Sequence, residues 1–476
     1  MNLENLTIEK ARKLLDSKEV TVRALADYYL GNIEKRNGEL NAVVGLFTNI
    51  DKQVEIAQSM IDAGKAKALT GIPYLLKDNI LYEGQIAGAA SKMLQNYTAT
   101  YDSHVVEMLK DQGAIALGRA NMDEFAMGSS TEFSYYGPTK NPHDTSRVPG
   151  GTSGGSAAAV AADMALFTLG SDTAGSIRQP AGFCGTVGYK PTYGVVSRHG
   201  LMAMGSSLDT IGPLTRTVAD TGIVHDVLSS YDPMDATNAP YDDRKKYIPA
   251  HEPKVIGVPR AFLQSDGVTD YVLEDFEKGL DALREVGYEI KDIDLPHIAL
   301  SLPVYYIVLP AEVSTNLSRY DGIRYGFSKT GKNLIDSYFE TKAEGFGPEA
   351  RRRILMGTYV LSAGYRDAYY TKATKVRTLI TEELRQAFQE VDIIATPTSP
   401  TDAFKFGEKA DPIAMYAADL FTVPSNITGT PAISIPTGKS PEDMPLSMQF
   451  MAPHFHDENL FIIGKKFEEA FAKKNS

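Results

Sequence analysis

Apolar and polar residues follow two different periods along this chain. Amphipathic helical patterns cover residues 8 to 63 and recur at Tyr271–Val286 and Gly357–Glu390. Short apolar runs between the helical stretches predict strands. These strand candidates are Ile72–Lys77, Ile115–Gly118, Ala165–Gly170, Lys254–Val258, Ile290–Ile293, Asp392–Thr396 and Ala432–Ile435. Strands that alternate with helices predict an α/β fold with a mixed β-sheet sandwiched between layers of helices.

The length of the chain allows a large core. It has 476 residues, of which 43% are hydrophobic and 23% charged, so a sizeable core can be buried. Because no linker or repeat divides the sequence, we expect a single domain over residues 1–476, with a helical N-terminal segment at residues 1–65. Residues 231–253 are rich in Asn, Asp and Pro and predict an excursion on the surface.

Targeting signals and cysteine usage bear on the location of the protein. The longest apolar run, Ala157–Gly170, is interrupted by Asp163 and is shorter than the ~20 residues that a membrane helix needs. Met1–Leu15 is polar, which does not suit a signal peptide. Cys184 is the only cysteine, so no intrachain disulfide can form. We therefore expect a cytoplasmic protein that makes no membrane contact.

The charge balance argues against RNA binding by this chain alone. Lysine and arginine number 48 against 60 acidic residues, a net charge of −12. The basic runs Arg244–Lys246 and Arg351–Arg353 are too short to follow a phosphate backbone. If a nucleic acid takes part in the function, a partner is expected to bind it.

Gly150–Ser176 is the segment best suited to carry chemistry. Its glycines allow unusual backbone angles close to a ligand, and Ser153 can cap a helix predicted at Gly155–Met164. The strand that follows leads into a tight turn over residues 171–176. A serine in such a turn can expose its hydroxyl beside unpaired N–H groups, as acyl transfer requires. Ser176 is therefore a candidate nucleophile.

Two other interpretations suit the same segment. Glycine- and serine-rich turns are usually only turns. A phosphate-binding loop would need Gly-Lys-Ser/Thr, or Gly-x-Gly-x-x-Gly opening a helix. Gly150–Ser156 has neither the lysine nor that spacing, so phosphate binding is not expected.

Lys77 is the candidate base. None of the eight histidines lies in a recognised catalytic or metal-binding motif, and we expect no metal site. The apolar run Leu69–Ile80 contains Lys77, and burial there would lower its pKa from the usual ~10.4. A shift to about 7 costs roughly 4 to 5 kcal/mol, and a neutral lysine can activate a serine. The alternative is that Lys77 snorkels or pairs with Asp78.

Several motifs together resemble the amidase signature family. The central ones are Gly71-Ile72-Pro73 with Lys77-Asp78-Asn79, Gly150–Ser156, and Gly170–Asp172 with Gly175–Pro180. Supporting segments are Asn121–Ser130, Gly188–Gly194, Ser207–Asp209, Asn316–Gly322, Arg353–Ile354, Lys375–Ile380 and Met415–Tyr416 with Asp419. The match runs nearly end to end. Its C-terminal segments are most similar to the glutamine-hydrolysing A subunits of tRNA-dependent amidotransferases.

The resemblance implies a catalytic triad of the Ser-Ser-Lys type. It places the catalytic lysine at Lys77 and the acyl-forming serine at Ser176. The bridging serine, usually preceded by a cis peptide bond, falls on Thr152, which keeps a hydroxyl but adds a β-branch that crowds the site. The oxyanion hole falls on the N–H groups of Thr173, Ala174, Gly175 and Ser176, with Ala174 where the family more often has glycine.

The resemblance also implies an amino-acid substrate. Arg353 would bind its α-carboxylate and Asp419 its α-ammonium group, with Tyr306 and Ser129 beside them. The register of this match leaves Arg352 and Tyr305 as alternatives one position earlier.

The implied activity is hydrolysis of glutamine to supply ammonia. The ammonia would convert Glu-tRNA(Gln), or also Asp-tRNA(Asn), to Gln-tRNA(Gln) or Asn-tRNA(Asn). Two other proteins of the amidotransferase, its B and C subunits, are the implied partners. The B subunit would contact the tRNA and use ATP and Mg²⁺, and the small C subunit would strap the other two together. No cofactor is expected on this chain itself.

Three alternatives stay open. The chain could be a stand-alone amidase acting on another small amide, or a non-catalytic assembly scaffold, which Thr152 would favour. A different class of glutamine amidotransferases uses a Cys–His pair. Cys184, however, lies in the apolar segment Gly182–Gly188, where we expect it to be buried and inert.

Overall fold

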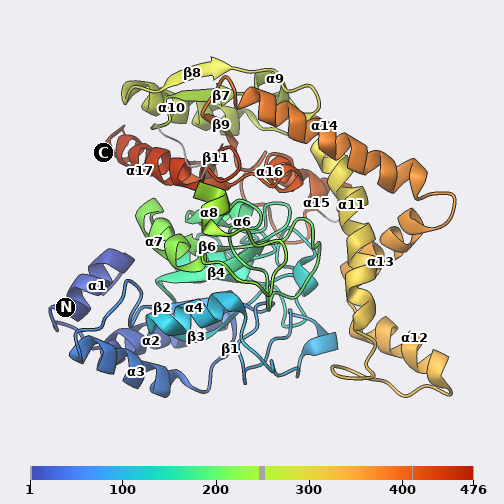
Figure 1. The fold of residues 1–476 in the computed structure, drawn as a ribbon, viewed down its shortest axis with the longest axis horizontal. Coiled ribbons are helices and arrows are strands. Elements are labelled where there is room, and N and C mark those ends of the chain that lie inside the picture. The colour runs from blue at the N-terminus through green and yellow to red at the C-terminus, as the bar shows by residue number, and fades with distance from the viewer. Residues whose placement is uncertain (1–2, 246–251, 410, 475–476) are drawn as a thin grey trace.

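The sheet at the centre of the molecule is mixed. The computed structural model describes residues 3–245, 252–409 and 411–474. Eleven strands within these ranges form one sheet (Figure 1). In spatial order they are β1 (Val43–Leu46), β3 (Ile115–Ala120), β2 (Pro73–Lys77), β4 (Phe167–Asp172), β6 (Thr210–Thr215), β5 (Val187–Lys190), β10 (Ala432–Lys439), β11 (Pro445–Met451), β9 (Ile393–Pro397), β7 (Val255–Val258) and β8 (Glu289–Asp292). The groups β3–β2–β4 and β9–β7–β8 are parallel, and the strands between them are antiparallel.

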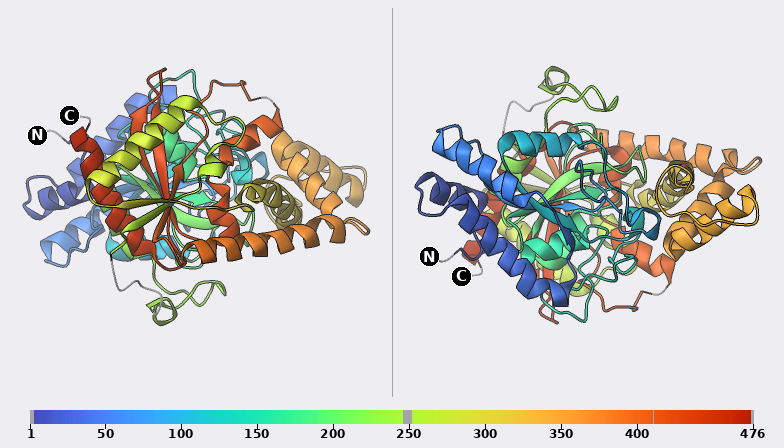
Figure 2. Two further views of the ribbon diagram at one scale, coloured as in Figure 1. Left: turned by 90° about the horizontal axis from the view of Figure 1, so that it is seen from above. Right: turned by 90° about the horizontal axis from the view of Figure 1, so that it is seen from below.

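Helices lie on both sides of this sheet (Figure 2), which confirms the predicted α/β sandwich. They are α1 (Ile8–Asp16), α2 (Val22–Leu40), α3 (Ile50–Asp62), α4 (His104–Gln112), α5 (Gly154–Ala161), α6 (Arg178–Cys184), α7 (Val218–Leu228), α8 (Tyr241–Lys245), α9 (Arg260–Leu263), α10 (Asp270–Glu285), α11 (Ser301–Asn316), α12 (Leu334–Gly345), α13 (Pro348–Leu361), α14 (Lys372–Ala387), α15 (Pro412–Tyr416), α16 (Val423–Thr428) and α17 (Asp457–Lys474). Helices α1 and α2 begin after Thr7 and Thr21, whose hydroxyls accept backbone N–H bonds of the first turn.

Helices α11, α12 and α13 project at one end of the molecule (Figure 1). Among the described residues, Ile298–Arg319, which contains α11, is the one helical stretch long and apolar enough to span a membrane. Half of its apolar window is buried in the protein, and Val304, Val308 and Leu309 belong to the core. We interpret α11 as a core helix that packs against α13.

All seven predicted strands are confirmed. Their ends differ from the prediction by one or two residues, except that β10 runs further, to Lys439. The strands β1, β5, β6 and β11 were not predicted. Two of them contain residues that usually argue against strands, since β6 includes Gly212 and Pro213 and β11 begins at Pro445. The other two are only four residues long.

Three helix predictions need correction. The helices predicted over residues 8–63 are α1, α2 and α3, but the unpredicted strand β1 lies between α2 and α3. The pattern Gly357–Glu390 is not one helix, because α13 ends at Leu361 and a π-helix at Asp367–Thr371 precedes α14. Gly364 lies in this break with a φ of 88°. Helix α5 ends three residues early, and the Ser153 side chain does not cap it.

The predicted excursion at residues 231–253 falls partly outside the described residues, which lack 246–251. In the described part, Tyr231 and Met234 are 50% and 70% exposed, whereas Asp232 and Asp235 are buried. Asp232 accepts a hydrogen bond of 2.6 Å from the hydroxyl of Ser197. This segment therefore has an exposed side and an anchored side. The single-domain organisation stays a prediction.

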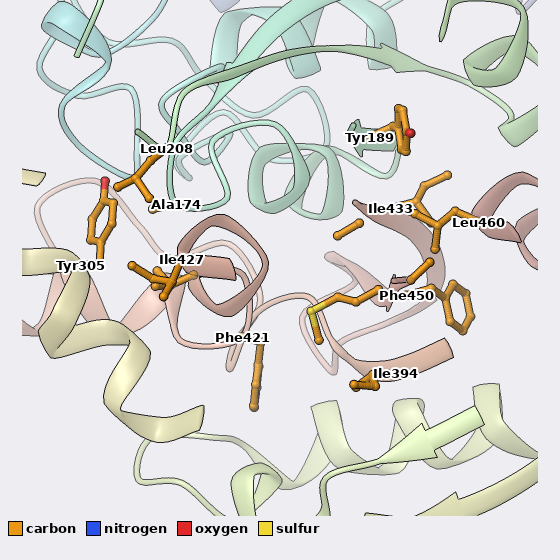
Figure 3. Packing of buried hydrophobic residues seen from close by; sticks show 14 of the residues in the cluster. Ala174, Tyr189, Leu208, Tyr305, Ile394, Phe421, Ile427, Ile433, Phe450 and Leu460 are labelled. Carbon is orange, nitrogen blue, oxygen red and sulfur yellow. The ribbon is translucent and has the colours of Figure 1, made fainter. Parts of the chain in front are cut away.

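Two large hydrophobic clusters share the interior. One surrounds strands β1 to β4, and the other extends over β7, β9, β10 and β11 and includes the residues drawn in Figure 3. Ala174 belongs to the second cluster and Ile177 to the first. The turn that contains Ser176 therefore lies at the junction of the two.

Candidate active site

Lys77 and the turn that contains Ser176 meet because their strands are neighbours. Lys77 is the last residue of β2 and Asp172 the last residue of β4, and these two strands pair in parallel. The carboxyl ends of parallel neighbours lie at the same edge of a sheet, where α/β proteins commonly build their sites. Residues 173–176 follow β4 directly, and α6 begins at Arg178.

The Lys77 amine is buried and contacts Thr152. Lys77 Nζ donates hydrogen bonds to Thr152 Oγ1 at 2.7 Å and to the carbonyl oxygen of Ser171 at 3.2 Å. Burial lowers the pKa of Lys77 to about 7, although nearby carboxylates, chiefly Asp123, oppose the shift. A large fraction of this lysine is therefore neutral near pH 7 and able to accept a proton.

The alternative pairing of Lys77 with Asp78 is wrong. The Asp78 carboxylate instead forms an ion pair with Arg119. It also accepts N–H bonds from Gly88 at 3.2 Å and from Ala90 at 2.8 Å. Lys77 and Asp78, although adjacent in the sequence, therefore contact different residues.

The loops that contain Thr152 and Ser176, the other two residues of the predicted triad, lie against each other. The peptide bond between Gly151 and Thr152 is cis, as in the family pattern. Ser176 is 6% exposed, and its carbonyl oxygen accepts the Ser153 N–H at 3.1 Å. Within the described chain, the Ser176 hydroxyl makes no hydrogen bond. The structure thus shows the link between Lys77 and Thr152, while the Ser176 hydroxyl is still free.

Asp172 holds the turn in shape. Its carboxylate accepts the N–H groups of Gly175 at 2.8 Å and Ile177 at 3.2 Å. Arg178 donates two further bonds to it, each of 3.0 Å. Burial acts to raise the pKa of Asp172, but Arg178 outweighs this effect and the pKa is about 2. An ionised Asp172 therefore fixes the backbone on either side of Ser176.

The predicted oxyanion hole needs one correction. The Gly175 N–H is already bound to Asp172, so it does not serve as a free donor. The N–H groups of Thr173, Ala174 and Ser176 have no partner among the described residues, so these three stay the predicted oxyanion donors. Gly175 has a φ of 129°, and a Cβ there would lie 2.2 Å from Thr422 Oγ1. Only glycine fits this position.

Ala174 departs from the family pattern without obstructing the site. It is 3% exposed and belongs to the second hydrophobic cluster. Figure 3 shows it beside Leu208, with Tyr305 and Ile427 close by. Its methyl group is therefore part of the core.

Asp419 forms one side of the predicted amino-acid site. Its Oδ2 accepts bonds from the Ser129 hydroxyl at 2.9 Å and from the Tyr306 hydroxyl at 3.5 Å. Burial raises the pKa of Asp419 to about 7, although the Ser129 bond and the charge of Arg353 act against the shift. The structure thus brings together residues that are up to 290 positions apart.

Arg353 forms the other side. Its guanidinium carbon lies 5.5 Å from the ring centre of Tyr306 and 5.4 Å from that of Tyr416. The two rings stack on each other, with centroids 3.8 Å apart. Arg353 Nε donates to Glu349 Oε1 at 2.8 Å, whereas Nη2 is buried and has no partner in the described structure. A buried donor of this kind calls for an acceptor, and a substrate carboxylate would supply one.

The two register alternatives have different surroundings. The Arg352 side chain is 43% exposed and forms an ion pair with Oε2 of Glu349. Tyr305 packs edge-on against Tyr306 in the core. Tyr306 thus contacts both Arg353, through its ring, and Asp419, through its hydroxyl.

A pocket of about 230 Å³ lies beside this amino-acid site. Glu349 and Tyr416, which contact Arg353, form part of its wall, together with Gly128 and the charged residues Arg352 and Lys409. Acidic and basic groups thus occur side by side, as recognition of a zwitterion requires.

Cys184 does not form a Cys–His pair. It is fully buried, and burial raises the pKa of its thiol. Its sulfur contacts the carbonyl oxygen of Pro149 at 3.4 Å. His143 Nε2 lies 3.0 Å from the carbonyl oxygen of Cys184 and hydrogen-bonds this backbone atom rather than the sulfur. These surroundings do not suit a reactive thiolate.

Comparison with known proteins decides the family. The amidase family model matches residues 24–461. The chain belongs to the amidase family. The A subunit of glutamyl-tRNA(Gln) amidotransferase from Caldanaerobacter subterraneus subsp. tengcongensis is 49% identical, over 99% of this chain and 97% of its own length. The protein of the same name from Moorella thermoacetica is 47% identical over the same shares.

Solved structures of amidase-family proteins share the fold. The A subunit of glutamyl-tRNA(Gln) amidotransferase from Thermotoga maritima has a TM-score of 0.81 and 39% identity, covering 98% of this chain and 96% of its own. A structure described as an amidase has a TM-score of 0.83 and 28% identity, covering 98% and 100%.

Sequence reasoning missed several residues that shape this amidase-family site. Gln179 accepts the Gly151 N–H at 2.9 Å and donates to the Ser129 carbonyl at 3.1 Å, so it ties two loops together. The opposite charges at Asp172 and Arg178, which bracket the turn, were a signal for their ion pair. Glu349 and Thr422 gave no such signal, because only the tertiary fold brings them to the site.

Proposed function

We propose that this amidase-family chain is the glutamine-hydrolysing component of a tRNA-dependent amidotransferase. The observation that carries the proposal is the buried hydrogen bond between Lys77 and Thr152 beside Ser176. Arg353 and Asp419 supply charges of both signs for the amino-acid end of glutamine. The full-length similarity to proteins named as the A subunit of glutamyl-tRNA(Gln) amidotransferase supports the same assignment.

In the first half of the reaction, Ser176 is acylated. Neutral Lys77 accepts the proton of Thr152 as Thr152 accepts that of Ser176, and the Ser176 oxygen attacks the side-chain carboxamide carbon of glutamine. The free N–H groups of residues 173, 174 and 176 stabilise the oxyanion, each typically by a few kcal/mol. The C–N bond breaks, the leaving nitrogen takes a proton back from the Lys77–Thr152 relay, and ammonia departs.

In the second half, water hydrolyses the glutamyl ester. The same relay accepts a proton from water, whose oxygen attacks the ester carbonyl. Ser176 leaves with that proton and glutamate is released. Thr152 replaces the usual bridging serine, so the relay in this chain is Ser-Thr-Lys.

Recognition of the substrate depends on its zwitterionic end. The Nη2 atom of Arg353, a buried donor without a partner among the described residues, would bind the α-carboxylate of glutamine. Asp419 would bind its α-ammonium group. Such charge-assisted hydrogen bonds are about twice as strong as neutral ones. A simple amide would form neither contact, which favours glutamine over small aliphatic amides.

The proposed assembly explains the acidic character of the chain. With a net charge of −12, it is poorly suited to hold tRNA. We propose that the B subunit of the amidotransferase binds the charged tRNA and uses ATP and Mg²⁺, and that its C subunit straps the other two together. This chain binds no cofactor in this proposal, and the assembly is cytoplasmic.

Ammonia release from glutamine tests the proposal. We expect weak release by the isolated chain and a rise on addition of the B and C subunits, ATP and Glu-tRNA(Gln). Coupling of 1–3 kcal/mol corresponds to roughly 5- to 150-fold. The same assembly containing the Ser176→Ala variant should release no ammonia above background. A chain that hydrolyses unrelated amides faster than glutamine and ignores the partners would instead be a stand-alone amidase, and an inactive chain that assembles normally would be a scaffold.

A further inference from the structure

Thr422 contacts both the amino-acid site and the turn that contains Ser176. It lies three residues after Asp419 and is fully buried. Its Oγ1 is 2.6 Å from the carbonyl oxygen of Ala174 and 3.1 Å from that of Asp419. Its N–H also donates to the Asp419 carbonyl at 3.1 Å. One residue thus joins the backbone of Asp419 to the backbone beside the nucleophile.

The contact with Ala174 fixes the orientation of a peptide group. The carbonyl of the Ala174–Gly175 peptide accepts the Thr422 hydroxyl, and the N–H of the same peptide donates to Asp172. The C=O and N–H of a planar trans peptide point in opposite directions. The two partners therefore hold this peptide, here called the clamped peptide, in one orientation. Gly175, with its φ of 129°, would otherwise allow this peptide to rotate.

The clamped peptide lies between two candidate oxyanion donors. The N–H of Ala174 belongs to the peptide before it, and the N–H of Ser176 to the peptide after it. If the clamped peptide turned, the directions of both N–H groups would change. Oxyanion stabilisation depends on donors fixed in place before the charge develops, so loss of the Thr422 bond should impair the chemical step.

The main chain of Thr422 is anchored as well. Arg178, which holds Asp172, also donates to the Thr422 carbonyl at 3.0 Å. Asn426, one turn further along α16, donates to Asp172 at 2.9 Å. The segment that begins at Asp419 is therefore bonded to the Ser176 turn at several points, and Thr422 is the point that bonds the peptide between the candidate oxyanion donors.

We infer that Thr422 is a positioning residue that couples binding of the substrate's α-ammonium group to the orientation of the oxyanion-binding N–H groups. The inference rests on the proposed function, because it requires Asp419 to bind that ammonium group. An occupied Asp419 holds residues 419–422 in place, and Thr422 transmits this constraint to the peptide of Ala174 and Gly175.

The test compares two substrates in the full chain assembled with the other two subunits of the amidotransferase. One is glutamine, and the other is 4-carbamoylbutanoate, which is glutamine without the α-ammonium group. For Thr422→Val, we expect kcat with glutamine to fall about 10- to 100-fold, with KM within about threefold, because misdirected donors should cost less than the roughly 10²- to 10³-fold of a deleted oxyanion-hole donor. The ratio of kcat values for glutamine and 4-carbamoylbutanoate should fall at least about fivefold, a coupling of the usual size.

Two further variants separate positioning from simple structural support. Thr422→Ser restores the hydroxyl and should keep kcat within about threefold of the parent. Ser425→Ala removes a neighbouring buried hydroxyl whose one bond within the described residues is to the Thr422 carbonyl, and it should leave the substrate ratio unchanged. If Thr422→Val does not fold, as judged by its unfolding temperature, Thr422→Ala removes the same hydroxyl with less crowding and carries the same expectation.

The possible results are distinct. Equal slowing of both substrates by the valine or alanine variant, or an unchanged kcat, would overturn the role of Thr422. A parent assembly that releases no ammonia from glutamine would overturn the proposed function, and this inference with it.

Discussion

Lys77 Nζ and Thr152 Oγ1 are 2.7 Å apart in a buried site. The sequence separates them by 75 residues, and the parallel pairing of β2 with β4 brings Lys77 to the edge of the sheet where the Thr152 and Ser176 loops meet. Burial lowers the pKa of Lys77 to about 7, which makes a lysine a usable base at neutral pH. The predictions that follow depend on this relationship.

The first prediction concerns the charge state of Lys77. Arginine keeps the positive charge but cannot become neutral near pH 7, so Lys77→Arg should be nearly inactive between pH 6 and 9. In the parent, the neutral fraction rises as the pH passes through a pKa of about 7, so kcat should increase through pH 7 and then level off. The measurement is ammonia release against pH, with exposed Lys67→Arg as the control. Substantial activity of Lys77→Arg would show that the lysine is only structural.

The second prediction concerns the replacement of serine by threonine at position 152. Thr152→Ser keeps the hydroxyl and removes the crowding methyl group, so activity should stay equal or rise. Thr152→Val keeps the shape but removes the relay, so kcat should fall about 10²-fold or more, the usual scale for proton transfer. Equal rates for the valine variant and the parent would exclude Thr152 from the mechanism. Unfolding temperatures should be measured alongside, because the position is buried.

The third prediction concerns the charge of Asp419. Because burial raises its pKa to about 7, Asp419 becomes a carboxylate as the pH rises, and KM for glutamine should fall between pH 6 and 8. Asp419→Asn keeps the shape but cannot ionise, so its KM should be about 10- to 100-fold higher, the size of a lost charged hydrogen bond, and should not vary in this way with pH. Asp443→Asn, the same change at an exposed carboxylate, serves as the control. A KM for Asp419→Asn close to that of the parent would contradict the role in ammonium binding.

Much of the sheet could be predicted because its strands are apolar and short. The run that ends at Lys77 and the run that ends near Gly170 both satisfy the simple periodicity of a buried strand. The strand that contains Gly212 and Pro213 does not, and its pairing with β4 on one side and β5 on the other stabilises it as a strand. Gly364 could have indicated the break between α13 and α14, because glycine weakens a helix. The helical pattern on both sides of it nevertheless favoured one continuous helix.

Some residues of the site could be predicted from local sequence, and others could not. Local pattern could suggest Ser176 and the buried Lys77, because a turn and a strand end are local features. Asp419 and Arg353 came from the family resemblance. The roles of Glu349 and Thr422 come from contacts between segments far apart in the chain, and no window of sequence contains such information.

Detection of a glutamyl ester on Ser176 tests the account most directly. The assembled protein would react briefly with labelled glutamine, be quenched in acid and be digested for mass spectrometry. We predict one glutamyl group on the peptide that contains Ser176, and neither label nor ammonia release with Ser176→Ala. Ser156→Ala, which removes a buried hydroxyl in α5 that bonds to the Leu169 carbonyl, should label like the parent. Label on the Cys184 sulfur, or near-normal ammonia release by Ser176→Ala, would contradict the account.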